Sequence, residues 1–518
     1  MARKYDPFSR QYVGYIQPAA TDTSQIKPGF YFKAHNLQHH YTVIQNMYGV
    51  GALGGRTRAA WQTRLGWVNE STSFRGFQLS VPWGLYETGA NGGGNFTNLD
   101  HLETVVNELG SLGKYVILMP FQFREFRNPD VSGLGIDEQM RYLLPEDLRT
   151  HQGVVTSIDI LQAQGKTIRS VTGTPSAALG VNGDYAHNAT TNILYGPKAG
   201  GVWPAGIDLD TNDPRRHWLW DYAYGYEKNQ NGGFGFEMKI YKQELRTRML
   251  RFAQAVADKF NANPTVIGIH TSESINGGAT YLGSAPGGIV DDGYTATAAL
   301  GVASNNARRA GLTGKTAVLQ AARPMFPNKF FAQDINVPLY TVNYVKEYFD
   351  YMQQYKMGST TSDVGWWEPD LNILGPEPNR GCLPRMADTS SIAPTTAQWQ
   401  QDGWDSVVHD APSITNTAGY NQRYADIYAR TTTGNAVTGF GMNCHMCIIQ
   451  LETSYNVWLG GTTQNTDPTA TGYNSAAPNG TTVPSLKDWL KAKFTAEGIT
   501  DGSGGLNTVR PLYVGYNS

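Results

Sequence analysis

The chain has 518 residues, of which 40% are hydrophobic and 16% are charged, and its formal net charge is −2. Intrinsic disorder requires low hydrophobicity with a high net charge, so this composition excludes a disordered scaffold. A near-neutral chain creates no long-range field for phosphates, so we expect no nucleic-acid partner. No apolar run reaches about 18 residues, so we expect no membrane-spanning segment.

Short apolar runs of strand type alternate with segments of helical periodicity along the chain. The run Tyr115 to Phe121 is continuously apolar, as in a strand buried on both faces, and Leu99 to Leu112 before it has apolar residues at helical spacing. The expected strands are Gly29 to Ala34, Arg75 to Trp83, Tyr115 to Phe121, Thr265 to His270, Thr316 to Ala321, Thr360 to Gly365, Ser406 to Asp410 and Met446 to Glu452. The expected helices are Leu99 to Leu112, Met238 to Phe260, Tyr340 to Met357, Thr396 to Gly403, Tyr420 to Thr433 and Ser485 to Phe494.

This alternation predicts an α/β fold, a (β/α)8 TIM barrel, because right-handed crossovers place every helix on one side of a parallel sheet. The barrel is expected over residues 29–500, between an N-terminal arm (1–28) and a C-terminal tail (501–518). Residues 124–236 interrupt the rhythm and predict a loop-rich insertion or lid after the third strand. In an alternative register, Ser406 to Asp410 is a loop and Arg510 to Tyr516 closes the barrel.

Acidic and aromatic residues follow several of the expected strands, where the active sites of such barrels lie. Sugar rings stack on aromatic side chains, and sugar hydroxyls bond to carboxylates, so this rim predicts a carbohydrate site. Hydrolysis of a glycosidic bond needs two carboxyl groups, and Glu273 and Glu452 are the catalytic candidates, with Asp410 or Asp370 as replacements for the second. The substrate-binding candidates are Trp83, Glu87, Trp367, Asp370, His409, Asp410 and Trp458.

The segment Gly268 to Ser274 (GIHTSES) at the end of the fourth strand carries a resemblance to a known family. With the order of elements from Gly29 to Phe494, it resembles the cellulase-like superfamily of (β/α)8 retaining glycosidases. The resemblance implies that Glu273 is the acid/base and that a second Glu after strand seven is the nucleophile. Ser272 stands where the family has Asn, and Glu452 lies after strand eight in the preferred register, so the second Glu has no matching position there.

The sequence is compatible with two functions from different classes. The first is an O-glycosyl hydrolase with a retaining, two-carboxylate mechanism that acts on an oligo- or polysaccharide. The second is a non-catalytic structural or assembly protein, a virion or surface component that retains the barrel. The arm, with Tyr5, Phe8 and Tyr12, has too few apolar residues to fold alone and is a candidate contact with a second copy of the chain.

Neither function needs a metal or other cofactor. The pair Cys444 and Cys447 has the spacing of two zinc ligands, but residues three apart on a strand face opposite sides, and no second pair completes four ligands. The N-terminus has no apolar stretch of a cleavable signal, so we expect a soluble protein, in a virion or outside the cell by a signal-less route, and the sequence does not decide its compartment.

Overall fold

The structure is a computed structural model of the chain, and it describes the barrel strands and the helices that pack on them. The described residues are 4–5, 12–13, 25–34, 58–89, 93–126, 140–155, 157–163, 165–209, 217–228, 233–240, 242–271, 314–335, 342–361, 364, 372–376, 380–399, 414, 416–450, 458–460 and 482–517.

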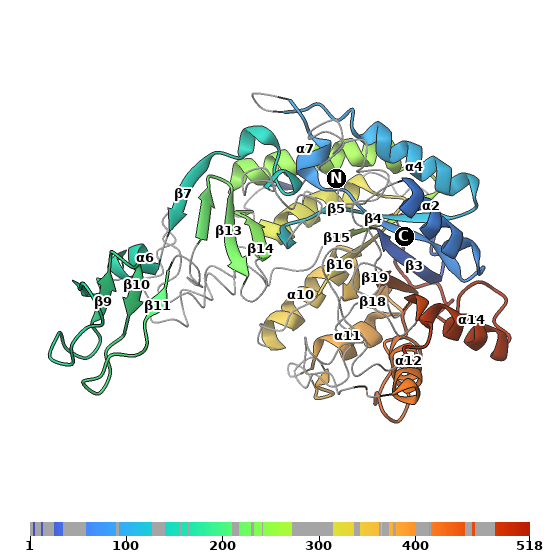
Figure 1. The fold of residues 1–518 in the computed structure, drawn as a ribbon. Coiled ribbons are helices and arrows are strands. Elements are labelled where there is room, and N and C mark those ends of the chain that lie inside the picture. Colours follow the sequence, from blue (N-terminus) through green and yellow to red (C-terminus); the bar gives the residue numbers. More distant parts are fainter. Residues whose placement is uncertain are drawn as a thin grey trace.

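Eight strands form a closed parallel barrel, which confirms the predicted fold class. Around the barrel the order is β15, β16, β17, β18, β19, β3, β4 and β5, and β5 pairs with β15 to close the ring. In Figure 1 helices lie around the outside of this ring. The strands are β3 (Gly29–Ala34), β4 (Phe74–Ser80), β5 (Tyr115–Phe121), β15 (Val266–Thr271), β16 (Phe330–Asp334), β17 (Gly358–Thr361), β18 (Thr395–Trp399) and β19 (Met446–Gln450).

The long helices α4 and α7 each bury one apolar face. In α7, for example, Leu245, Met249 and Phe252 are fully buried and recur at helical spacing. Two helices begin at a side-chain cap, because Asn416 accepts a hydrogen bond from the backbone of Gly419, and Ser485 from that of Asp488. The barrel helices are α2 (Arg58–Asn69), α3 (Trp83–Tyr86), α4 (Leu99–Ser111), α7 (Gln243–Phe260), α10 (Val342–Gln354), α11 (Cys382–Thr389), α12 (Thr417–Thr431) and α14 (Leu486–Ala496).

The predicted fifth strand, Thr316 to Ala321, is wrong. Residues 314–322 are helical, with Val318 and Leu319 buried, and the strand is β16 instead. A short apolar run does not distinguish a buried strand from a buried helix, and Ala, Leu and Gln in this run favour the helix. Arg323 follows this helical segment, and its guanidinium donates to the carbonyls of Lys356 and Phe326, which precede strands β17 and β16.

The sixth and seventh strands also differ from the prediction. Strand β17 begins two residues earlier than expected, and the predicted helix Thr396 to Gly403 is wrong because Thr395–Trp399 is strand β18. The segment Ser406 to Asp410 lies outside the described residues, and the seventh strand of the closed barrel in chain order is β18. The alternative register is wrong too, since Arg510 to Tyr516 forms no strand and places Val514 against the barrel interior.

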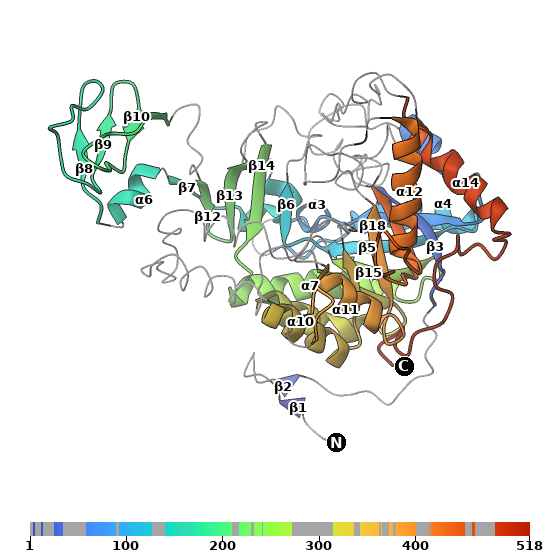
Figure 2. The same cartoon turned by 90° about the horizontal axis from the view of Figure 1, so that it is seen from below.

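Between β5 and α7 the chain forms two further sheets. The first contains five antiparallel strands in the order β6, β14, β13, β12, β7, and the second contains four in the order β11, β10, β9, β8. Figures 1 and 2 show both sheets to one side of the barrel, with the four-stranded sheet farther from it. The strands are β6 (Arg124–Phe126), β7 (His151–Val155), β8 (Ile168–Ser170), β9 (Tyr185–Asn188), β10 (Ile193–Tyr195), β11 (Ile207–Asp208), β12 (His217–Trp220), β13 (Ala223–Lys228) and β14 (Gly233–Met238).

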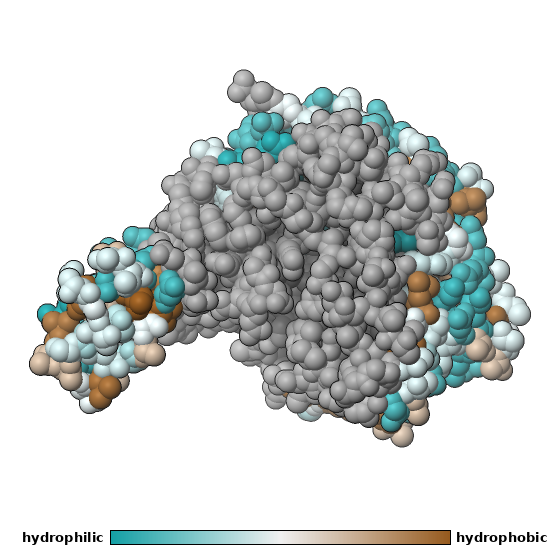
Figure 3. Space-filling model, viewed as in Figure 1, coloured by the Kyte–Doolittle hydropathy of each residue, from teal (hydrophilic) through white to brown (hydrophobic). Residues whose placement is uncertain are grey.

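The four-stranded sheet has a small core of its own. Leu161, Tyr185, Leu194 and Leu209 form a buried cluster there. Figure 3 shows a mixed polar and apolar surface over this unit. Val181 precedes β9 and Val202 follows β10, and both side chains are exposed. The Gly, Asn and Thr content of residues 124–236 predicted loops, but the stretch contains the strands of both sheets. Alternating aromatic residues, such as those of AYGYEK in β13 of the five-stranded sheet, supply the strand propensity.

The interior of the barrel is apolar near the N-terminal ends of the strands. We call this cluster the apolar plug. Only glycine fits at position 268, because the Phe330 ring lies 2.1 Å from the position that a Cβ atom would take there. The plug consists of Tyr31, Ile117, Ile267, Phe330, Ala332, Met446, Ile448 and Val514. No helix among the described residues is long and apolar enough to cross a membrane.

Candidate active site

Above the apolar plug, toward the C-terminal ends of the strands, the interior becomes polar. We call this set the polar layer. Residues two apart on a strand point to the same face, so the next inward-facing residue beyond the plug belongs to this layer. On β3, for example, Lys33 follows Tyr31, and on β16 Asp334 follows Ala332. All of its members are 5% exposed or less, so none is an ordinary surface residue. They are Lys33, Gln78, Ser80, Gln122, His270, Asp334, Thr360, Thr396 and Gln398.

Hydrogen bonds between strands that are not neighbours show that these side chains meet inside the barrel. Gln78 Nε2 on β4 and His270 Nδ1 on β15 are 2.9 Å apart, although β5 lies between their strands. His270 Nε2 is 3.5 Å from Thr396 Oγ1 on β18. Gln398 Nε2 donates to Asp334 Oδ2 at 3.1 Å across β17. The layer is therefore a cross-linked network that spans the interior.

His270 is held neutral in this network. Burial, together with the nearby charge of Lys33, lowers its pKa from 6.5 to about 3. A neutral imidazole has one donor and one acceptor nitrogen. If Nδ1 accepts from the Gln78 amide, Nε2 carries the proton and faces Thr396.

Asp334 is the carboxylate that sequence reasoning missed. It ends β16 and is fully buried, and its backbone nitrogen donates to Thr271 Oγ1 at 2.9 Å. Thr271 is the last residue of β15, two positions before Glu273. The signal in the sequence is FFAQD, an apolar run that ends in a carboxylate, but the run at Thr316 to Ala321 comes earlier in the chain and predicts the fifth strand there.

The two predicted catalytic glutamates lie outside the described residues, but the strands before them do not. Glu273 follows the end of β15 by two residues, and Glu452 follows the end of β19 by two residues. Three strands separate β15 from β19 in either direction around the ring. Strands β15 and β19 therefore end on opposite walls of the barrel, at the end where the interior is polar.

Trp83 and Trp458 are core residues, not the exposed stacking platforms that we expected. Both indoles are fully buried. Trp458 packs edge-on against Phe32 and Phe74 with ring centroids 4.9 and 5.5 Å away, and Trp83 stacks on Phe252 of α7. A ring with no exposed surface cannot stack on a sugar. Position after a strand predicted the location of these residues, but packing of the helices against the barrel decided their environment.

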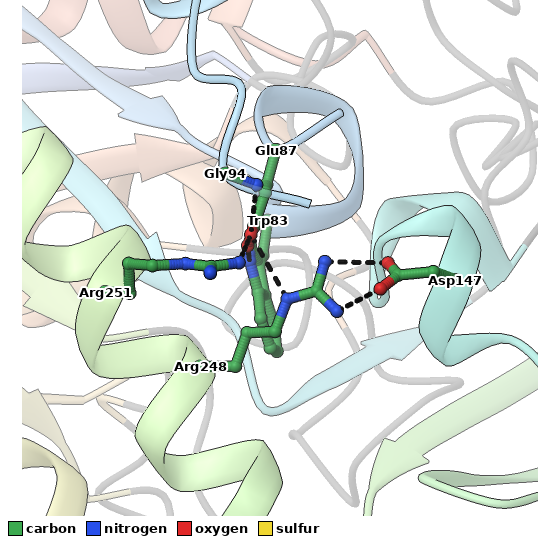
Figure 4. Close-up of polar contacts among 6 residues, drawn as sticks. All are labelled: Trp83, Glu87, Gly94, Asp147, Arg248 and Arg251. Atoms are coloured by element: carbon green, nitrogen blue, oxygen red, sulfur yellow. Dashed lines mark hydrogen bonds and ion pairs between the residues drawn. The ribbon is translucent and has the colours of Figure 1, made fainter. Parts of the chain in front are cut away.

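Glu87 is also not a free carboxylate at the barrel mouth. Its side chain is fully buried and accepts hydrogen bonds from Trp83 Nε1, the Gly94 backbone at 3.0 Å, and Arg248 Nε at 3.2 Å. Figure 4 shows the Arg251 guanidinium on the same carboxylate and the Arg248 guanidinium facing the carboxylate of Asp147. This network ties the segment after β4 to α7, which gives Glu87 a structural role in place of the predicted contact with substrate.

The remaining candidates, Trp367, Asp370, His409 and Asp410, lie outside the described residues, and their roles stay predictions. Within the described ranges, no cluster of three or more His, Cys, Asp or Glu side chains is arranged to hold a metal ion. Cys444 and Cys447 are buried there, and burial raises the pKa of both thiols, so neither is a ready thiolate ligand.

No protein-family model matches the chain, and no curated protein sequence matches it. Among solved structures, the chain is similar to a beta-galactosidase from the psychrophilic Marinomonas ef1, with a TM-score of 0.40 and 8% identity over 92% of this chain and 61% of that one. It is also similar to an alpha-amylase from Geobacillus thermoleovorans, complexed with acarbose, with a TM-score of 0.35 and 10% identity over 90% of this chain and 77% of that one. The match thus spans less than two thirds of the beta-galactosidase. The assignment of the fold rests on the strand pairing of the barrel itself.

Proposed function

We propose that this protein is a glycoside hydrolase that binds and cleaves an oligo- or polysaccharide at the C-terminal end of its barrel. One observation carries the proposal: Glu273 and Glu452 follow opposite strands at the end where the barrel interior is polar. Active sites of barrels of this class lie at that end. Opposite walls are also where two carboxylates must stand to face a sugar from both sides of the scissile bond.

In the proposed mechanism Glu273 is the acid/base and Glu452 the nucleophile. Glu452 attacks the anomeric carbon while Glu273 gives its proton to the leaving oxygen, so the C–O bond breaks as a glycosyl ester forms. Water then attacks the ester, Glu273 takes up a proton from it, and the sugar leaves with its configuration retained. Retention requires the two carboxyl groups to be about 5 to 5.5 Å apart. Apart from this water, both steps use groups of the chain alone.

The test measures release of reducing ends by the full chain across a panel of neutral and acidic polysaccharides. We expect Glu273→Gln and Glu452→Gln each to lower kcat at least about 100-fold, the lower range of the contribution of a positioned acid or base. Glu244→Gln, on the exposed first turn of α7, is the matched control and keeps full activity. Undiminished activity of Glu273→Gln rejects the assignment.

If Glu452→Gln alone keeps its activity, the second carboxylate lies elsewhere. Asp410 and Asp370 were the replacements from the sequence, and Asp334 joins them because it is buried in the polar layer. Asp→Asn at each of these positions identifies the partner by the same loss of kcat. The stereochemistry of the first product, followed by NMR, then distinguishes retention from inversion.

We retain contact between copies of the chain through the N-terminal arm as a second, separable proposal. Within the arm, β1 (Lys4–Tyr5) and β2 (Tyr12–Val13) pair as antiparallel strands. Ile26 packs against the apolar plug, so a truncation must end before it. Removal of residues 1–24 is expected to lower the mass measured by light scattering if the arm joins subunits. An unchanged mass rejects the arm as a contact.

A further inference from the structure

We infer that Gln78, Gln122 and Gln398 are specificity-determining residues whose amide oxygens accept hydrogen bonds from the hydroxyl groups of the bound sugar. The inference rests on the proposed function and assigns the group that the polar layer recognises: an unsubstituted hydroxyl.

The same arrangement occurs at all three glutamines. The amide nitrogen of Gln78 is held by His270, that of Gln122 by Ser80, and that of Gln398 by Asp334. A side-chain amide is planar, with its oxygen opposite its nitrogen, so fixing the nitrogen fixes where the oxygen points. Each glutamine is therefore oriented by a partner.

The amide oxygens of these three glutamines have no hydrogen-bond partner among the residues that the structure describes. Thr360 Oγ1, in the same layer, has none there either. A buried acceptor left without a donor costs about 1–3 kcal/mol, so four such atoms in one layer are unfavourable for folding alone. Such unpaired acceptors call for an explanation, and a bound ligand that donates hydrogen bonds to them supplies one.

The three glutamines also stand on different walls. Gln78 lies on β4 and Gln122 directly follows β5, whereas Gln398 lies on β18, which is separated from β4 by β19 and β3. A sugar ring presents hydroxyl groups around its whole edge, so it matches acceptors on opposite walls. An anionic group does not match these acceptors, because its negatively charged oxygens would face the amide oxygens, which are the negative ends of the amide dipoles.

The first experiment uses the wild-type chain and methyl glycosides of glucose, galactose and mannose, with their singly deoxyfluorinated derivatives. Fluorine is close to a hydroxyl in size but donates no hydrogen bond. By calorimetry, we expect loss of at least one hydroxyl to weaken binding about 10-fold or more, the cost of leaving a buried acceptor unpaired.

The second experiment compares variants by a discrimination ratio. We define it as the affinity for the parent sugar divided by the affinity for the deoxyfluorinated derivative that binds most weakly. Gln398→Met removes the acceptor at nearly constant volume and is expected to lower the ratio toward one. Asp334→Asn keeps the shape but replaces the charged acceptor of the Gln398 amide by a weaker neutral one, and is expected to lower the ratio in part. Gln333→Met is the matched control: Gln333 is equally buried, one residue from Asp334, and its carbonyl oxygen is bonded to Tyr348 on the helix side.

The outcomes separate the two proposals. If the wild type binds sugars and deoxyfluorination costs nothing, or if Gln333→Met lowers the ratio as much as Gln398→Met, the inference is overturned and the proposed function stands. If the wild type binds none of the glycosides and cleaves no polysaccharide, the proposed function fails and the inference falls with it. A variant that does not fold is replaced by Thr360→Val, which removes an unpaired hydroxyl of the same layer and carries the same expectation.

Discussion

The two halves of the barrel interior differ in whether their buried polar atoms have hydrogen-bond partners. The apolar plug at the N-terminal end contains only hydrophobic side chains, all 2% exposed or less. The polar layer at the C-terminal end is as deeply buried but contains two charged residues and unpaired amide oxygens. Burial of apolar area favours folding, whereas burial of unpaired polar groups opposes it. The plug therefore stabilises the barrel, and the layer is retained at a cost in stability, as expected of a functional site.

The largest effect is expected from truncation in the plug. Phe330→Ala removes a fully buried ring that packs on Gly268 and His270, and we expect the free energy of unfolding to fall by about 3–5 kcal/mol. Chemical denaturation measures this loss. A loss below about 1 kcal/mol contradicts the assignment of the plug as the stabilising half.

A carboxylate outside the layer gives the next test. Glu87→Ala removes the acceptor of the buried Trp83 Nε1 and of the Gly94 backbone, while Arg248 keeps its pairing with Asp147. We expect a loss of about 1–3 kcal/mol, because buried donors are left without a partner. At a temperature where the variant is folded, affinity for polysaccharide should equal that of the wild type. Lost affinity with unchanged stability instead restores Glu87 as a substrate contact.

The third effect depends on pH. Burial lowers the pKa of His270 in the layer to about 3 and that of His445, which precedes β19, to about 4, both from 6.5. Because the unfolded chain binds the proton more tightly, stability is full above pH 6.5 and falls as the pH drops below it. Each histidine accounts for about 2 kcal/mol between pH 6.5 and 5. His270→Gln and His445→Gln should each flatten this dependence, and an unchanged slope in the double variant contradicts the assignment.

The smallest effect has the opposite sign. Thr360→Val replaces an unpaired buried hydroxyl by a methyl group of the same shape, and we expect stability to rise by about 1 kcal/mol. Thr396→Val is the matched control one strand away; its hydroxyl faces His270, so the variant should lose stability. If the two variants change stability equally, the difference between paired and unpaired hydroxyl groups in the polar layer is contradicted.

Much of the fold could be predicted from the sequence, and the errors have a common cause. Continuous or long periodic segments, such as Tyr115–Phe121 and Gln243–Phe260, were predicted correctly in type. The short strands Phe330–Asp334 and Thr395–Trp399 were missed, because a five-residue segment has too few residues for its periodicity to separate strand from helix. Each missed strand also displaced the residue expected at its end, which is why Asp334 and Gln398 were not among the candidates.

The sequence by itself determined that this chain is an α/β barrel, because alternating strand and helix patterns leave a parallel sheet few ways to close. It also placed Glu273 and Glu452 directly after barrel strands. Only the tertiary structure decided what surrounds each side chain. Trp83, Trp458 and Glu87 follow strands as predicted but are buried by helices that arrive from elsewhere in the chain, and the polar layer forms from strands far apart in sequence. Burial and hydrogen bonding depend on these long-range contacts, which no local pattern specifies.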